Sequence, residues 1–269
     1  MALFTVGSVP YVNAVPLIAL FERMGMDSPV AVRYDVPSRL PAMLASGEVQ
    51  AILVSSVDAL RNPGRQMADG VCIGSANAVR SVRLFSKVPF DEVATLALDA
   101  SSMTSNRLAQ IVLSEVYGAT PEARPWPSDL DVMLEHADAA VLIGDKGMTA
   151  SAEGLHVCDL GEAWRDLTGL PFVWAGWIGD ERLTPELVGW LQQAQEFAHQ
   201  DPESVIELAR ERSGWPREMV VAYLTKTMSY RLTPEMKAGM AEFGRRLIEL
   251  GLEPHISTPQ WVSGLATVS

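Results

Sequence analysis

Short apolar runs alternate with amphipathic segments over the first fifty residues. The runs of strand length are residues 3–6, 30–34 and 51–54. Asn13 and Ser38 stand where helix N-caps are expected, and Gly47 stands where a helix ends, at a position that favours positive φ. Three strands separated by two helices predict a parallel sheet with right-handed crossovers.

The same pattern restarts after Lys87-Val-Pro89, which reads as a hinge. Before this hinge, further strands are predicted at residues 70–76 and 80–86. After it, strands are predicted at residues 95–98, 139–143 and 171–178. A helix is predicted from Thr104 to Tyr117, with Thr104 or Ser102 as its cap and Gly118 as its stop. After Gly179 strand signals disappear. Helices are predicted at 185–199, 203–213, 216–228 and 234–250, and each start carries a proline.

The 269 residues fit two lobes better than one average domain. Lobe I is predicted to comprise residues 1–87 and 179–269, and lobe II residues 88–178. The apolar stripes of the C-terminal helices need a surface to cover, and lobe I offers one. The prediction is an α/β fold of two lobes with a cleft between them.

Composition narrows the function classes. Hydrophobic residues make up 48% and charged residues 20%, which predicts a buried core and argues against disorder. The net charge of −12 disfavours nucleic acid and anionic membranes, although a small anion can still bind in a desolvated pocket. The N-terminal residues lack a signal-peptide pattern and no run of eighteen residues is apolar, which predicts a cytoplasmic location. Cys72 and Cys158 lie in apolar stretches and are predicted to be buried free thiols.

Familiar catalytic motifs are missing from the chain. The four histidines have no metal-ligand spacing, and there is no nucleotide-binding glycine pattern or nucleophile elbow, so neither a metal nor a cofactor is predicted. Uncharged polar clusters instead follow the strands, at residues 7–13, 55–56, 101–105 and 144–145. Ligands collect at the carboxyl ends of strands in open α/β sheets. One cleft lined by hydroxyls and amides is therefore predicted.

Several longer segments carry a family resemblance. They are Gly7-Ser-Val-Pro-Tyr-Val-Asn-Ala-Val-Pro16, residues 36–56, Val79-Arg-Ser-Val-Arg-Leu-Phe-Ser-Lys-Val-Pro89, Asp138-Ala-Ala-Val-Leu-Ile-Gly-Asp145, residues 159–164 and residues 168–177. In this order and at this spacing they resemble the MqnA family, chorismate dehydratases of the futalosine route to menaquinone. The resemblance implies a fold like that of a type II periplasmic binding protein, without the export signal.

The resemblance also implies a reaction. Chorismate, a dianion, loses water from C3 and C4 to give 3-[(1-carboxyvinyl)oxy]benzoate, and charge that develops on the ring carboxylate needs hydrogen bonds. Asn13 and Ser81 match family site positions and are the predicted catalytic residues, contacting the enolpyruvyl group, a carboxylate or the departing oxygen. The segments that carry Asn13 and Ser81 hold no His, Lys or Glu except Lys87. The enolpyruvyl carboxylate of the substrate is therefore the predicted base.

Substrate-binding roles are expected for a further set of residues. The set is Tyr11, Ser55, Ser56, Thr104, Ser105, Asp145 and Trp177. The hydroxyls would grip the carboxylates at strand ends and at a helix N-terminus, and the aromatic rings, with Trp174, would flank the substrate ring. Structural roles stay open: Asn13 and Thr104 as helix caps, Ser81 as a satisfied buried hydroxyl, Asp145 as a cap or hinge contact, and both tryptophans as core.

Three other functions compete. The related MqnD family, which makes 1,4-dihydroxy-6-naphthoate, carries a histidine near the strand that here ends in Ile143-Gly-Asp145, so the dehydratase is favoured. An anionic-solute-binding protein shares the fold, but the missing leader argues against it. A regulator would need a helix-turn-helix, for which no segment precedes the first strand. An exposed face on the C-terminal helices is compatible with a homodimer.

Overall fold

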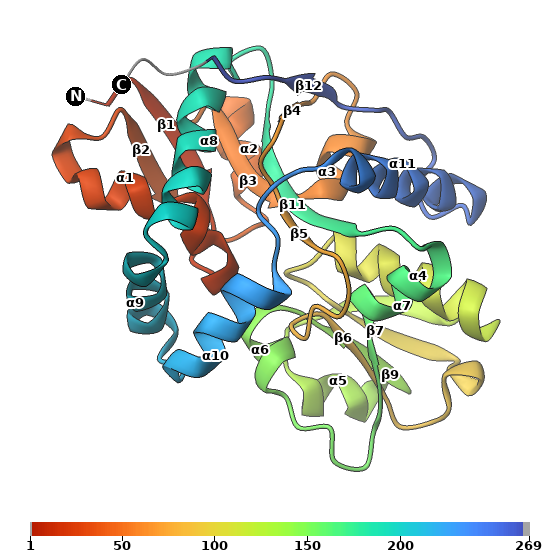
Figure 1. The fold of residues 1–269 in the computed structure, drawn as a ribbon. Coiled ribbons are helices and arrows are strands. Elements are labelled where there is room, and N and C mark those ends of the chain that lie inside the picture. The colour runs from red at the N-terminus through yellow and green to blue at the C-terminus, as the bar shows by residue number, and fades with distance from the viewer. Residues whose placement is uncertain (1, 266–269) are drawn as a thin grey trace.

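The computed structural model describes residues 2–265, which form two sheets with helices packed around each (Figure 1). The first sheet has the order β12-β4-β11-β3-β1-β2, with β5 also paired to β11. Its strands are β1 (Phe4–Ser8), β2 (Val30–Tyr34), β3 (Ala51–Ser55), β4 (Gln66–Ala68), β5 (Ile73–Ser75), β11 (Phe172–Gly179) and β12 (Gln260–Val262). The predicted parallel start is confirmed, because β1 pairs in parallel with both β2 and β3.

The second sheet has the order β10-β6-β9-β7-β8. Its strands are β6 (Arg83–Ser86), β7 (Thr95–Asp99), β8 (Glu122–Trp126), β9 (Ala139–Leu142) and β10 (His156–Asp159). Strand β7 is parallel to β8 and β9, whereas β6 is antiparallel to β9 and β10. Sequence reasoning missed β8 and β10, because both strands are half exposed and lack a continuous apolar run.

The helices cover the faces of the two sheets. They are α1 (Ala19–Met24), α2 (Leu40–Ser46), α3 (Ser56–Arg61), α4 (Thr104–Tyr117), α5 (Leu130–His136), α6 (Gly144–Thr149), α7 (Leu160–Thr168), α8 (Pro185–Gln200), α9 (Pro202–Ser213), α10 (Arg217–Ala222) and α11 (Pro234–Glu249). Three 3₁₀ segments, η1 (Val12–Leu17), η2 (Gly25–Asp27) and η3 (Phe90–Glu92), and one π-helical segment, η4 (Tyr223–Thr227), complete the set.

Helix ends follow local chemistry where the chain is exposed. Thr184, Asp201 and Thr233 accept hydrogen bonds from the backbone N–H three residues on, which confirms the predicted starts of α8, α9 and α11. Gly47 and Gly118 end α2 and α4 in the left-handed conformation, as predicted.

Two predicted caps, Asn13 and Ser38, are wrong, and of the two candidates for α4 it is Ser102 whose hydroxyl accepts a hydrogen bond from the Ser105 N–H, at 3.3 Å. Asn13 lies inside η1, whose first turn follows an extended Tyr11. Ser38 precedes α2 by two residues, and Arg39 takes the capping position without a side-chain bond. Thr104 is the first residue of α4 rather than its cap. Its hydroxyl accepts a hydrogen bond from the Val57 N–H in the first turn of α3. At Thr104 a tertiary hydrogen bond outweighs the capping preference, whereas Ser38 is exposed.

The chain crosses between the sheets earlier than the predicted boundaries at 87/88 and 178/179. Strand β6, which those boundaries assign to lobe I, pairs with β9 and β10 of the second sheet. Strand β11, which they assign to lobe II, pairs with β3 of the first sheet. The crossings are therefore residues 76–82 and 169–171. The apolar sequences of β6 and β11 are compatible with either sheet. The sequence pattern therefore does not indicate with which sheet each strand pairs.

The C-terminal helices return to the first sheet, as predicted. Helices α8 and α9 pack on η1 and α1, and α11 packs on β11 (Figure 1). Helix α11 also reaches α4 of the second sheet, where Arg246 pairs with Glu115. The short strand β12 corrects the expectation that no strand follows Gly179. Cys72 and Cys158 are buried free thiols, as predicted.

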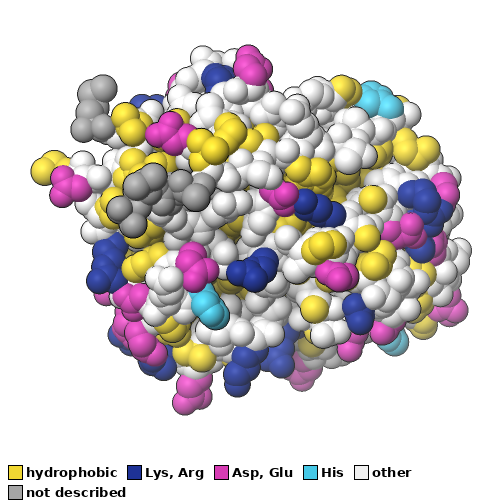
Figure 2. Space-filling model, turned by 45° about the horizontal axis from the view of Figure 1, so that its top comes forward, with side chains coloured by type: hydrophobic (Ala, Val, Ile, Leu, Met, Phe, Trp, Pro, Cys, Tyr) yellow, Lys and Arg dark blue, Asp and Glu magenta, His cyan; other side chains and the backbone are white. Residues whose placement is uncertain are grey.

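Acidic and basic side chains are interspersed on the face shown in Figure 2, and apolar side chains form small groups between them. Many of the cations are paired: Arg245 contacts Glu242 at 2.7 Å, and Arg107 contacts Glu253 at 2.9 Å. Within residues 2–265, no helix has both the length and the apolar composition needed to cross a bilayer.

Candidate active site

A narrow cavity of about 80 Å³ lies where the two sheets meet. Its walls come from β3, β5 and β11 of the first sheet, from the 76–82 crossing, and from the loops after β7 and β9 of the second. The polar side chains that line it are Tyr11, Asn13, Ser55, Ser81, Ser101, Ser102, Thr104 and Ser105. None of the described lining residues is charged. The polar part of the lining is thus made mainly of hydroxyls and one side-chain amide, set among apolar side chains.

Asn13 and Ser81 meet on a third residue, Tyr223. The Ser81 Oγ lies 2.7 Å from the Tyr223 hydroxyl, and the side chain of Asn13 lies close enough to the same hydroxyl to lower its pKa. Burial raises the pKa of Tyr223 to about 12, so the phenol stays protonated near neutral pH. Its one proton and two lone pairs allow a hydrogen bond to both partners at once. Tyr223 therefore holds Asn13 and Ser81 in one network.

Sequence reasoning missed Tyr223. It lies in η4, the π-helical end of a segment that was predicted as one α-helix over 216–228. The Trp215 ring packs against the Tyr223 ring, with centroids 5.6 Å apart. A π-helical turn often occurs at a functional site, but no local pattern marks where it will form.

A buried carboxylate organises the wall contributed by the second sheet. Asp99, at the carboxyl end of β7, accepts hydrogen bonds from the Ser101 N–H at 2.9 Å and the Ser101 hydroxyl at 2.6 Å. It also accepts from the Ser128 hydroxyl at 2.5 Å and the Ile143 N–H at 3.3 Å. Asp99 thereby fixes the loops after β7 and β9. The sequence signal that could have found it is an acidic residue at the last position of an apolar strand.

The N-terminus of α4 connects the two lobes. The Thr104 Oγ1 accepts a hydrogen bond from the Val57 N–H at 3.1 Å, at the start of α3 on the first-sheet side. Within residues 2–265, the hydroxyls of Ser55 and Ser105 have no hydrogen-bond partner. These two hydroxyls, one from each side of the cavity, are thus free to bind a ligand beside the positive end of the α4 dipole.

Three predicted substrate-binding residues do not line the cavity. Ser56 is buried and its hydroxyl donates to the Val173 carbonyl at 2.7 Å, so it links α3 to β11. Trp177 is 0% exposed and lies in the core, opposite Leu53 in the pairing of β11 with β3. Trp174 lines the cavity instead, and its indole N–H donates to Ser75 at 3.0 Å. Asp145 is the third residue outside the lining, although its neighbour Gly144 lines the cavity.

Asp145 lies in the first turn of α6, where the residue is exposed overall but its carboxyl group is partly desolvated. Burial raises the pKa of its carboxyl group, and its charge raises the pKa values of both Tyr11 and Tyr223. The carboxylate is therefore less stable in the folded chain than in the unfolded chain. The contribution of this carboxyl group to the stability of the fold is greatest below its pKa in the unfolded chain. That contribution is lost as the pH rises through its higher pKa in the folded chain.

Asp145→Asn is accordingly expected to stabilise the protein near neutral pH. The thermal midpoint should rise by about 2 °C at about pH 7, because the substitution removes an uncompensated charge. At about pH 3, where the carboxyl is protonated in both states, the midpoints of variant and native protein should coincide. Thermal unfolding followed by circular dichroism at both pH values checks this, and a lower midpoint for the variant at about pH 7 would contradict it.

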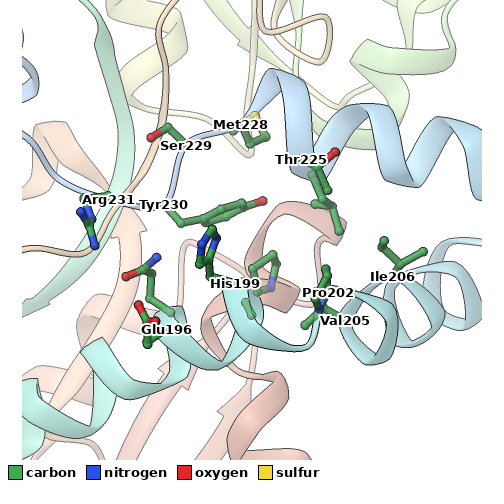
Figure 3. Close-up of a pocket in the computed structure, with 14 residues that line it drawn as sticks. Glu196, His199, Pro202, Val205, Ile206, Thr225, Met228, Ser229, Tyr230 and Arg231 are labelled. Atoms are coloured by element: carbon green, nitrogen blue, oxygen red, sulfur yellow. The ribbon is translucent and has the colours of Figure 1, made fainter.

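A larger cavity of about 590 Å³ lies among α8, α9, η4 and residues 228–231 (Figure 3). Figure 3 shows the Tyr230 ring extending across it, between His199 and Met228. Met228 also lines the narrow cavity, so the two are neighbours. Of these two cavities the narrow one is the better candidate, because polar groups from the sides of both sheets converge in it. Among the described residues, no group of three or more His, Cys, Asp or Glu side chains could hold a metal ion.

Comparisons with known proteins agree with this architecture. The chain is 28% identical over 264 residues to the chorismate dehydratase of Thermus thermophilus, covering 91% of this chain and 95% of that protein. A solved structure from Archaeoglobus fulgidus superimposes with a TM-score of 0.73 at 17% identity, covering 93% of this chain and 98% of the other. The periplasmic aliphatic sulphonate binding protein of Escherichia coli gives a TM-score of 0.62 at 14% identity, with 99% and 95% covered.

The two structural matches establish the fold. The predicted two-lobed arrangement resembling a periplasmic binding protein is therefore confirmed. A sequence model described as menaquinone biosynthesis matches residues 4–249, which is most of the chain. The match includes every polar residue that lines the narrow cavity. The chain therefore belongs to the menaquinone biosynthesis family, as its motifs predicted.

Proposed function

We propose that this protein is a chorismate dehydratase, a hydro-lyase that converts chorismate to 3-[(1-carboxyvinyl)oxy]benzoate and water. The observation that carries the proposal is the meeting of Asn13 and Ser81 on Tyr223 at the wall of an uncharged cavity. The relative from Thermus thermophilus, which bears the name chorismate dehydratase, supports the same reaction.

Neutral donors bind the dianion in this proposal. The Ser55 and Ser105 hydroxyls reach the carboxylates from opposite lobes, and the first N–H groups of α4 add the favourable end of the helix dipole. Hydrogen bonds in a dry cavity are stronger than in water. The net charge of −12 acts mainly through solvent, where salt screens it over about 8 Å.

Substrate entry requires the lobes to separate. The cavity has a volume of about 80 Å³, which is room for a few water molecules at about 30 Å³ each. A six-membered ring with two carboxylate arms needs a volume several times larger. The crossings at 76–82 and 169–171 are the segments that link the two sheets, so they are the natural hinges. Closure then expels water and orients the reacting groups.

The elimination proceeds from C3 and C4 of the ring. The proton at C3 passes to the enolpyruvyl carboxylate of the substrate, and the C4 hydroxyl takes up that same proton as it leaves as water, so the product remains a dianion. Asn13 and Ser81 hydrogen-bond the carboxylate or the departing oxygen as charge develops. Tyr223 does not serve as the base, because with a pKa of about 12 its phenol remains protonated. Its role is to hold the other two side chains.

Incubation of the purified protein with chorismate tests the proposal. A product lighter by one water, with the absorbance of a substituted benzoate, is the expected result. Unchanged chorismate that raises the thermal midpoint would instead indicate a protein that binds the anion without catalysis. Unchanged chorismate with no effect on the midpoint would contradict the proposal and direct attention to the naphthoate synthase reaction.

A further inference from the structure

The 76–82 crossing contains a strained turn immediately before Ser81. Arg80 has a φ of 62°, the only positive φ among the non-glycine residues of 2–265. The Ser81 N–H donates to the Val79 carbonyl at 2.8 Å, which closes a three-residue turn around Arg80. A γ-turn with positive φ at its centre is rare and strained for a residue that has a Cβ. Such strain persists only where neighbouring contacts hold it.

Asp159 supplies those contacts. Its Oδ1 accepts from the Val79 N–H at 2.9 Å, and its Oδ2 accepts from the Arg80 N–H at 2.6 Å. The same carboxylate caps α7, because Oδ1 also accepts from the N–H groups of Gly161 at 2.9 Å and Glu162 at 3.2 Å. Four backbone donors from two segments thus share one side chain. This carboxylate binds the crossing to the N-terminus of α7, together with the Leu160 N–H, which donates to the Val82 carbonyl at 3.1 Å.

Two glycines allow the turn to approach this closely. A Cβ on Gly161 would lie 2.6 Å from the Asn77 carbonyl oxygen, and a Cβ on Gly147 of α6 would lie 2.3 Å from the Ser81 carbonyl oxygen. Both distances are too short for real atoms, and the atoms they meet belong to backbone. The turn is therefore enclosed between α6 and α7, and Ser81, 1% exposed, is pressed toward Tyr223.

We propose that Asp159 is a positioning residue, which holds the strained turn at Arg80 and thereby fixes the Ser81 hydroxyl against Tyr223 at the cavity wall. The inference rests on the proposed function, because it assigns Ser81 its place in that reaction. The Asp159-Leu-Gly161 motif lies 78 residues downstream of Ser81 in the sequence. In this proposal it supplies the carboxylate that accepts from four N–H groups and the glycine that lets the turn approach α7 closely.

Asp159→Asn tests the role at nearly constant size. The amide replaces one acceptor oxygen with an NH₂ group, which faces N–H donors and cannot bind them. The turn should then relax, and kcat for chorismate should fall by about 10- to 100-fold while KM changes less than about threefold. Asp201→Asn is the matched control, since Asp201 also caps a helix but holds no crossing segment. Its kcat should remain native.

Arg80→Gly provides the rescue. Glycine adopts positive φ without strain, so in the Asp159→Asn background it should raise kcat by about fivefold and raise the thermal midpoint. In the native background, where Asp159 already holds the turn in place, the same substitution should leave kcat native, and relief of the strained φ should raise only the thermal midpoint. A folded Asp159→Asn variant with native kcat, or a double variant with no gain in either quantity, would overturn the proposal.

The two readouts separate failure of the proposed function from failure of this inference. If the native protein leaves chorismate unchanged, the proposed function fails, and the thermal midpoints of the four proteins still decide whether Asp159 and Arg80 are coupled. If the native protein dehydrates chorismate and the midpoints and kcat values are simply additive, the proposed function stands and the positioning role fails.

Discussion

Asn13→Ala is expected to lower kcat for chorismate by about 100- to 1,000-fold while the protein remains folded. Asn13 is the only side-chain amide among the described residues that line the cavity, and it is held there by Tyr223. Removal of one preorganised donor from a developing negative charge costs about this factor in other enzymes. The alanine also leaves the Tyr223 hydroxyl with one fewer partner. Steady-state kinetics with chorismate provides the measurement.

Asn62→Ala is the matched control for Asn13→Ala. Asn62 donates to the backbone and carboxylate oxygens of Asp58 at 2.9 and 3.0 Å, away from the cavity. Loss of these bonds should lower the thermal midpoint without lowering kcat. If Asn13→Ala retained native turnover, or if both variants lost turnover only in proportion to lost stability, Asn13 would have no part in the reaction.

Tyr223→Phe is expected to lower kcat by about 10- to 100-fold with little change in KM. The substitution keeps the ring packed against Trp215 and removes only the oxygen between Asn13 and Ser81. Loss of that hydroxyl frees two side chains whose orientation the transition state requires. Because the pKa of Tyr223 is about 12, its titration does not shape activity between about pH 6 and pH 9. The variant should therefore keep the native pH profile at a lower level.

Tyr230→Phe is the control for Tyr223→Phe. The Tyr230 hydroxyl is buried and has no hydrogen-bond partner in the described structure, so its removal breaks no bond. The Tyr230→Phe variant should match the native protein in kcat and equal or exceed it in thermal midpoint. Native kcat in Tyr223→Phe, or equal losses in both variants, would show that the network through Tyr223 does not position the reacting groups.

Local sequence rules predicted much of the cavity. Ser55, Ser101, Ser102 and Ser105 follow apolar strands, and the carboxyl ends of those strands meet where the two sheets meet. Ser56 shows where such rules stop. It is adjacent to Ser55 and of the same type, yet the backbone turns it toward β11 rather than into the cavity. A run of serines does not specify which member faces the ligand.

Long-range contacts account for the rest. Tyr223 lies 142 residues from Ser81, and only the return of the C-terminal helices to the first sheet brings them together. Asp159 lies 80 residues from Val79, and its capping position alone predicts bonds to α7 but not to the crossing. The wrong cap at Asn13 has the same origin, because its amide lies beside Tyr223 from the C-terminal region instead of capping its own helix.

The most direct measurement is chorismate turnover by native protein and by Ser81→Ala, compared in one assay with both proteins shown to be folded by circular dichroism. We predict that the native protein releases one water per chorismate and forms the substituted benzoate, and that Ser81→Ala does so at least about tenfold more slowly. Equal turnover by the two folded proteins, or chorismate left intact by the native protein, would contradict the account.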